Sequence, residues 1–200
     1  MGKIDENKRE KEERLLSTAL KLFTEKGFAK TSISDIVEAA DVAKGTFYLY
    51  FKDKYDLKDK ITEYKTHELF LNAHHELREQ NIVGLDNQLI FIIDYIIDQL
   101  KDDTGLLNLI SKNLVLGTLR QTFISSSKED NEVYIDFLRL VNEGEQEYEN
   151  IDVLLFMVVE LAGSSCYTSI IHHEPLPLEE YRTFLHNTIR LIVKSFQKNN

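Results

Sequence analysis

Side chains that can bind a phosphate or the edge of a nucleobase are concentrated in one short segment, KGTFYLYFKDK at residues 44–54. A lysine such as Lys44 can donate to guanine O6 and N7 or to a phosphate oxygen. Tyr48 and Tyr50 each combine an aromatic ring with a hydroxyl, and Gly45 has no side chain to keep a ligand away from the backbone. These residue types and their spacing predict contact with nucleic acid.

Two short helices joined by a tight turn are needed to position this segment, and residues 31–57 have the pattern for them. Ser32 and Asp35 have the spacing of a helix-capping pair, so the first helix is expected to begin at Ser32. The turn falls at Asp41, and the second helix covers about 43–50. Such a helix-turn-helix holds its second helix in the major groove of DNA.

The rest of the chain is expected to be helical, because glycine and proline are scarce, at 8 and 2 residues, and no segment alternates as a strand does. We expect an all-α protein with an N-terminal three-helix head at residues 1–53 and a C-terminal helical bundle, the body, at residues 54–200. Gly27 ends the first helix, and Asp53 caps the helix that joins head and body. Outside the helix-turn-helix, helices are expected at residues 8–26, 54–80, 85–101, 105–126, 130–144, 151–173 and 178–197.

Charge is distributed unevenly along the chain. The net charge is −10, but residues 1–65 contain 14 Lys/Arg and 13 Asp/Glu, whereas residues 66–200 contain 10 and 21. A nearly neutral head on an acidic body suits a protein that touches DNA only at its head. The charged start predicts no signal peptide, and the uninterrupted apolar runs are too short to span a bilayer. We therefore expect a soluble, cytoplasmic protein without a membrane partner.

Residues 15–57 resemble the TetR family of bacterial transcriptional regulators. Their sequence is LLSTALKLFTEKGFAKTSISDIVEAADVAKGTFYLYFKDKYDL, and the resemblance lies in the order and spacing of its GF, TS, DI, VAKGTFYLYF and K-x-x-L elements. The resemblance covers residues 8–60. It implies a homodimer with DNA-binding heads and ligand-binding bodies, joined through helices 151–173 and 178–197. Most such proteins repress transcription and leave their double-stranded DNA operator when a small-molecule effector binds. One departure is Ala43, which stands where a serine often caps the DNA-reading helix.

The resemblance also implies which residues touch DNA. Carried over position by position, these contacts are Ser32, Ser34, Lys44, Gly45, Thr46, Tyr48, Leu49, Tyr50 and Lys54. Lys44 and Tyr48 are assigned to bases. The phosphate backbone is assigned to Ser32, Thr46, Tyr50 and Lys54. The alternative is that the tyrosines are half-buried core residues and the lysines are merely solvated.

Glu160 is the candidate ligand-binding residue of the body. Its neighbours three and four positions away are apolar or small, so its carboxylate could anchor a cationic ligand; the alternative is a partly exposed residue at the dimer interface. Asp94 and Asp98 share a polar helix face and are expected to be solvated. The dimer interface is expected to combine small residues around Gly163 with the apolar side of the last helix, Tyr181, Leu185, Ile189, Ile192 and Phe196.

No residues have the spacing of a catalytic, cofactor or metal site. The pairs His74–His75 and His172–His173 are adjacent on helices, where side chains diverge by roughly 100°, so neither pair can chelate one ion. Cys166 is the only cysteine, which excludes an intrachain disulfide and leaves a redox role as an alternative. The leading hypothesis is a DNA-binding transcriptional repressor. A partner-binding protein that does not read DNA and an all-α enzyme are the competing ones.

Overall fold

The computed structural model describes residues 3–113, 138, 141 and 146–198. Within these residues every regular element is a helix, apart from one isolated β-bridge between Tyr148 and Gln197, so the all-α expectation is confirmed. The helices are α1 (Lys3–Glu25), α2 (Ile33–Ala39), α3 (Lys44–Tyr50), α4 (Lys54–Arg78), α5 (Leu85–Asp102), α6 (Thr104–Asn113), α8 (Ile151–His172) and α9 (Leu178–Ser195).

Most helix boundaries agree with those expected from the sequence. α1 begins earlier, at Lys3, because the charged stretch ahead of residue 8 is rich in good helix formers such as lysine and glutamate. α6 is described as far as Asn113, so the rest of the expected helix 105–126 lies outside the described residues. The expected helix 130–144 also lies outside them, apart from residues 138 and 141.

The head is built from α1, α2 and α3 around an apolar core. Leu15, Ile36 and Phe47, one from each helix, have no exposed surface. α1 stops before Gly27, whose φ of +87° lies in the left-handed region that glycine adopts without strain after a helix. The Thr31 hydroxyl donates to the Gly27 carbonyl at 3.0 Å, which holds the loop between α1 and α2 against the end of α1.

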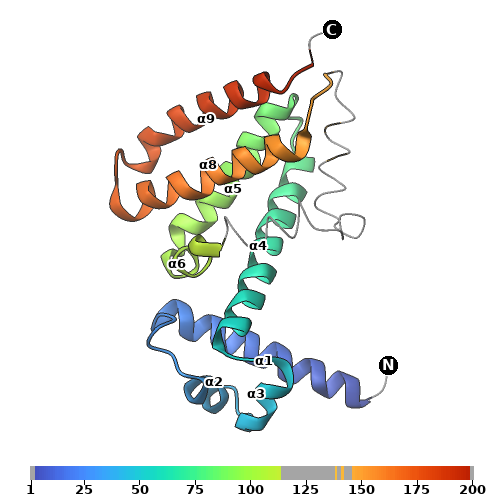
Figure 1. Ribbon diagram of the computed structural model, residues 1–200, viewed down its shortest axis with the longest axis vertical. Coiled ribbons are helices and arrows are strands. Elements are labelled where there is room, and N and C mark those ends of the chain that lie inside the picture. Colours follow the sequence, from blue (N-terminus) through green and yellow to red (C-terminus); the bar gives the residue numbers. More distant parts are fainter. Residues whose placement is uncertain (1–2, 114–137, 139–140, 142–145, 199–200) are drawn as a thin grey trace.

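α4 runs from the head into the body (Figure 1). Leu57 and Ile61 are buried near its start, where α4 packs against α1, and Leu69 and Leu77 are buried further along, where it packs against α5. Because α4 is one continuous helix, it connects the two parts of the molecule as a rigid rod.

α6 makes a second junction between body and head. It lies at the lower end of the body, next to the end of α1 (Figure 1). A Cβ atom at Gly105 would lie only 2.9 Å from both the Cβ and the carbonyl oxygen of Thr24. The first turn of α6 therefore touches the last turn of α1 at backbone distance, which only glycine permits.

α5 and α9 are joined by a network of charges. Arg182 Nη1 lies 3.0 Å from Asp94 Oδ1, and Arg182 Nη2 lies 2.5 Å from Asp98 Oδ1. His186 Nε2 lies 2.9 Å from Asp94 Oδ2, and Lys101 Nζ lies 2.9 Å from Asp98 Oδ1. The expectation that Asp94 and Asp98 are simply solvated was therefore wrong, because their arginine partner comes from a helix that begins far along the chain.

α8 is long and apolar enough to cross a bilayer, with a mean hydropathy of 1.6 over its most apolar window. The uninterrupted apolar runs of α8 are short, as expected, because Glu160 interrupts them, but averaged over the helix the hydropathy is that of a possible span. In the structure α8 packs against α9, α5 and α6, and 39% of that window is buried inside the body. A core helix of a soluble protein satisfies the same criterion, so this property is weak evidence for a membrane span.

Candidate nucleic-acid interface

Ser32 begins α2 with a complete capping box. Its Oγ accepts a hydrogen bond from the Asp35 N–H at 3.1 Å, and Asp35 Oδ2 accepts from the Ser32 N–H at 2.7 Å. The Ser32 hydroxyl also donates to Asp35 Oδ2 at 2.6 Å, and these hydrogen bonds lower the pKa of the Asp35 carboxyl. Since the hydroxyl proton is engaged, a phosphate at this end of α2 would meet the exposed Ser34 and backbone N–H groups instead.

The turn between α2 and α3 is held by backbone hydrogen bonds. The Val42 N–H donates to the Val37 carbonyl at 3.0 Å, and the Asp41 N–H donates to the Glu38 carbonyl at 3.2 Å. Asp41 has a φ of 51°, a left-handed conformation that aspartate adopts more readily than most residues. Ala43 is the N-cap of α3 and its side chain makes no capping hydrogen bond, so the start of α3 depends on the backbone alone.

α3 presents one face to the head core and the other to solvent. Phe47 and Phe51 are 0% and 1% exposed, and their ring centroids lie 5.6 Å apart. Tyr48 and Leu49 point the other way and are 53% and 79% exposed, and Lys44 is exposed as well. The alternative that Tyr48 is a core residue is therefore excluded.

The remaining predicted contacts on α3 differ in how accessible they are. Thr46 and Tyr50 are half-buried, so their outward atoms lie at the margin of the exposed face. Gly45 is exposed, and a Cβ atom there would meet nothing within 4 Å. Its φ is not in the left-handed region either, so no requirement inside the chain explains a glycine at this position. The missing side chain matters only to a molecule that approaches from outside.

The Lys54 ammonium is turned toward the protein. Its Nζ donates to the Phe28 carbonyl at 2.8 Å and to the Thr31 carbonyl at 2.7 Å, and it lies 4.3 Å from the centroid of the Phe28 ring. These contacts fasten the loop between α1 and α2 to the start of α4. Lys54 is therefore placed where it positions α2, rather than fully displayed for the phosphate contact that the resemblance implies.

Phe28 lies at the centre of the contacts between the loop after α1 and the start of α4, and the sequence pattern did not indicate this role. Its ring makes edge contacts with Phe23 and Tyr55, each at a centroid distance of 5.1 Å. Lys58 Nζ lies 5.4 Å from the same ring. The signal in the sequence was the GF pair after α1, which predicts a fold-back but does not identify the partners.

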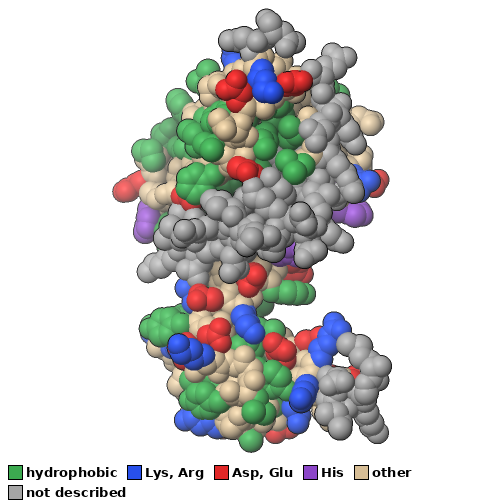
Figure 2. Space-filling model, turned by 45° about the vertical axis from the view of Figure 1, so that its right-hand side comes forward, with side chains coloured by type: hydrophobic (Ala, Val, Ile, Leu, Met, Phe, Trp, Pro, Cys, Tyr) green, Lys and Arg blue, Asp and Glu red, His purple; other side chains and the backbone are tan. Residues whose placement is uncertain are grey.

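Charged side chains are distributed differently on head and body. In Figure 2 most of the lysine and arginine side chains in view lie on the head, at the bottom, whereas hydrophobic side chains gather on the body. Among the described residues no three His, Cys, Asp or Glu side chains converge as the ligands of a metal ion would.

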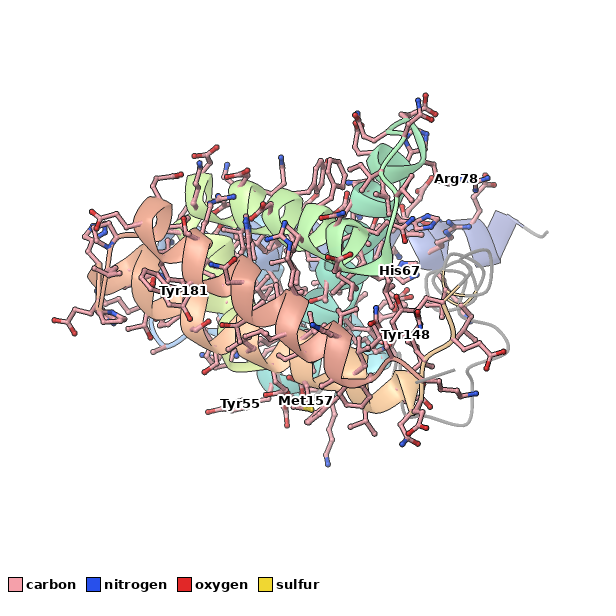
Figure 3. All side chains as sticks on the ribbon, turned by 90° about the horizontal axis from the view of Figure 1, so that it is seen from above. Tyr55, His67, Arg78, Tyr148, Met157 and Tyr181 are labelled. Atoms are coloured by element: carbon pink, nitrogen blue, oxygen red, sulfur yellow. The ribbon has the colours of Figure 1, made fainter. Side chains whose placement is uncertain are left out.

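The outer face of α8 and α9, defined here by five large apolar residues, is exposed. Phe184 and Leu191 on α9 are 61% and 67% exposed. On α8 the exposed residues are Val153, Phe156 and Met157. Figure 3 shows Met157 at the edge of the body, pointing away from it.

Two of the five apolar residues expected to form the interface on α9 are buried inside the body. Leu185 and Ile189 are 1% and 0% exposed and belong to the core of the body, so they are unavailable to a second chain. Glu160 is half-buried, and its burial raises the pKa of its carboxyl. A small apolar cavity lies between α4, α5, α6 and α8, and Glu160 is not among the residues that line it.

Comparison with known proteins connects the head to one family. Residues 15–61 match the family model described as "Bacterial regulatory proteins, tetR family". The chain is 46% identical over 55 residues to the uncharacterized HTH-type transcriptional regulator YerO of Bacillus subtilis, covering 28% of this chain and 19% of that protein. It is 34% identical over 82 residues to the probable acrEF/envCD operon repressor of Escherichia coli, covering 36% and 37% of the two chains. The matches thus span about a fifth and about a third of these relatives.

The fold of the whole chain has a counterpart among solved structures. The regulator FadR from Bacillus subtilis, solved in complex with stearoyl-CoA, superimposes with a TM-score of 0.59 over 92% of this chain and 98% of its own, at 18% identity. At that identity the likeness shows the fold alone. Residues 15–61, which include the capped α2 and the outward-facing α3, are therefore similar to the N-terminal part of the tetR family, and the whole chain shares its fold with a solved regulator.

Proposed function

We propose that this protein is a transcriptional repressor that binds operator DNA as a homodimer and is released by a small-molecule effector. The observation that carries the proposal is the outer face of α3, which displays a lysine, a glycine, a tyrosine and a leucine while two buried phenylalanines hold the helix in place. An exposed, aromatic and cationic helix face on a helix-turn-helix suits insertion into the major groove.

The predicted contacts have distinct roles on this face. Lys44 and Tyr48 are the outward residues that can reach base edges, and Gly45 lets the backbone of α3 approach the duplex closely. Ser34 and the margin residues Thr46 and Tyr50 suit phosphate contacts, which set the register of the protein on DNA.

The exposed outer face of α8 and α9 supports the homodimer. Large apolar side chains clustered on one side of a body usually mark an interface. A second copy presents the same face, so α8 and α9 of two chains would pack as a four-helix arrangement. Such a dimer presents two α3 helices to half-sites about 34 Å, or one helical turn, apart.

The two junctions between head and body support control by an effector. α4 is continuous through both parts, and α6 touches α1 at Gly105 while its Leu107 lines the body cavity. A ligand that shifts α6 or α4 therefore alters the position of the head, and a change in DNA affinity of tenfold corresponds to a coupling of about 1.4 kcal/mol. The regulator FadR of Bacillus subtilis, solved in complex with stearoyl-CoA, supports the binding of a ligand, and the probable operon repressor of E. coli supports repression. A protein with this role works in the cytoplasm, where the DNA is.

Fluorescence anisotropy with the DNA upstream of the protein's own gene tests the proposal. The wild-type protein is expected to bind this DNA at low salt more tightly than a scrambled duplex. Tyr48→Ala is expected to lower the affinity at least tenfold, because it removes an exposed contact without touching the core. Tyr64→Ala, which removes a tyrosine that is 64% exposed on α4, is the matched control and leaves binding unchanged. Equal affinity for both duplexes would favour a partner-binding protein that does not read DNA. Full binding by the Tyr48 variant would remove Tyr48 from the proposed DNA contacts.

A further inference from the structure

A small apolar cavity lies inside the body, and we propose that it is the effector site and accepts an uncharged, apolar ligand group such as the end of an alkyl chain. The inference deepens the proposed function and rests on it, because effector control requires a ligand site in the body. It also decides between two chemical classes, since the alternative from the sequence is a cationic ligand held by Glu160.

The shape and lining of the cavity favour an apolar group. Its volume is about 60 Å³, and four helices surround it, with Phe70 on α4, Ile93 on α5, Leu107 on α6 and Ala162 on α8. A cavity of about 150 Å³ with such a lining stays dry and binds benzene or xenon. A cavity of this smaller volume suits only the tip of a chain, and the rest of the ligand leaves through its open side.

Among the described residues that line the cavity, the polar side chains are neutral. Burial raises the pKa of the Cys166 thiol to about 11, so this lining side chain remains protonated at physiological pH and is a weak nucleophile. The Tyr167 hydroxyl donates to Asn108 Oδ1 at 3.0 Å, and this pair is exposed. A ligand hydroxyl, amide or ester can exchange hydrogen bonds with Tyr167, which lines the cavity, whereas no lining side chain among the described residues could neutralise a charge.

A charged ligand group would be opposed by the same lining. Moving an ion from water into an apolar cavity costs several kcal/mol unless it is paired there. Val159, next to Glu160 in sequence, and Gly163, three residues after it, line the cavity, while Glu160 itself does not. Its carboxylate is therefore not placed to supply the counter-charge that a cation in this cavity requires.

Isothermal calorimetry with three probes that share one alkyl chain tests the inference on the full-length protein. The probes are hexan-1-ol, hexylammonium and heptanoate at pH 7, which share a hexyl chain and carry a neutral, a cationic and an anionic head group. Hexan-1-ol is expected to bind at least tenfold more tightly than either ion. An ion that binds as tightly as the alcohol, or more tightly, overturns the inference.

Two variants locate the binding. Ala162→Val adds two carbon atoms into the cavity and is expected to weaken hexan-1-ol at least tenfold, whereas Gln99→Val places the same β-branched residue on the exposed side of α5 and leaves the affinity unchanged. Leu107→Phe fills the cavity from α6 and replaces Ala162→Val if that variant loses its helical circular dichroism. Unchanged alcohol affinity in a folded, filled variant overturns the inference.

The DNA measurement separates this inference from the proposed function. If the protein prefers the alcohol but binds no specific DNA, the ligand assignment of the cavity stands and the proposed regulatory function is wrong. If the protein binds specific DNA and is released by hexylammonium rather than by hexan-1-ol, the proposed regulatory function stands and the uncharged ligand class is wrong.

Discussion

Replacing Lys54 with methionine separates two roles that a lysine at the start of α4 can have. Methionine keeps the length and much of the apolar stem of the side chain but removes the ammonium. In the structure that ammonium holds the carbonyls of Phe28 and Thr31 at 2.8 and 2.7 Å. If this is its main role, the substitution weakens the attachment of α2 to α4 and only indirectly affects DNA.

The expected loss of stability follows from these contacts. A hydrogen bond from a charged donor contributes about 1.5–3 kcal/mol, and a cation over an aromatic ring contributes about 0.5–1 kcal/mol at exposed sites. Because these hydrogen bonds are only partly buried, water replaces part of their contribution in the variant, and we expect a net loss of about 2 kcal/mol. For a chain of this length that corresponds to a fall of about 4–8 °C in Tm.

The salt dependence of DNA binding distinguishes a positioning residue from a phosphate contact. Each phosphate contact contributes about −0.9 to the slope of log K against log salt concentration, so losing one per head in a dimer would change the slope by about 1.8. We expect Lys54→Met to lower the affinity with an unchanged slope. Lys44→Met, on the exposed face of α3, is expected to make the slope less negative and shows that the assay detects a lost cation. Lys52→Met, at an exposed position, controls for the effect on Tm.

A less negative slope in Lys54→Met, together with an unchanged Tm, would refute this reasoning. It would mean that the ammonium leaves the two carbonyls when DNA arrives and binds a phosphate instead. An unchanged slope with unchanged affinity and a lowered Tm would limit Lys54 to stability alone.

Three further predictions concern the body. Phe184→Glu places a charge on the exposed outer face of α8 and α9 and is expected to convert a dimer into monomers in analytical ultracentrifugation; a dimer of wild-type affinity would count against that face. Gly105→Ala places a Cβ 2.9 Å from the backbone of Thr24 and is expected to destabilise the protein by about 1–3 kcal/mol in urea unfolding, since the atom it meets is backbone. Burial raises the pKa of the Asp98 carboxyl, but hydrogen bonds from Lys101 and Arg182 lower it by more, so the pKa is lowered overall. The stability from these ion pairs is present above the ordinary aspartate value near 3.8 and is lost as pH falls through the lower folded pKa; Asp98→Asn should therefore flatten the fall in Tm below about pH 4 in calorimetry.

The head could be predicted from the sequence because its signals are local. Ser32 and Asp35 form the capping pair that their spacing indicated, and Gly27 ends α1 with the backbone conformation that glycine favours. Phe47 and Phe51 fall on one side of a short helix, so their burial followed from helical periodicity alone.

The body was harder to predict because its contacts join distant segments. Asp94 faces an arginine 88 residues further along the chain, and no local sequence pattern indicates such a partner. On α9 apolar residues occupy both sides, so periodicity could not show that Leu185 is buried and Phe184 exposed. The inward turn of Lys54 was missed for the same reason, since its two acceptors lie in the loop before α2.

The arrangement of α3 affects how this protein could change its operator over evolution. The residues that fix the helix in place, Phe47 and Phe51, are separate from the outward residues that we propose meet the bases, Lys44 and Tyr48. Mutations at the outward positions therefore alter the preferred sequence at little thermodynamic risk to the domain. Single substitutions on the outward face can therefore change which operator is bound, while the buried residues that hold α3 in place stay the same.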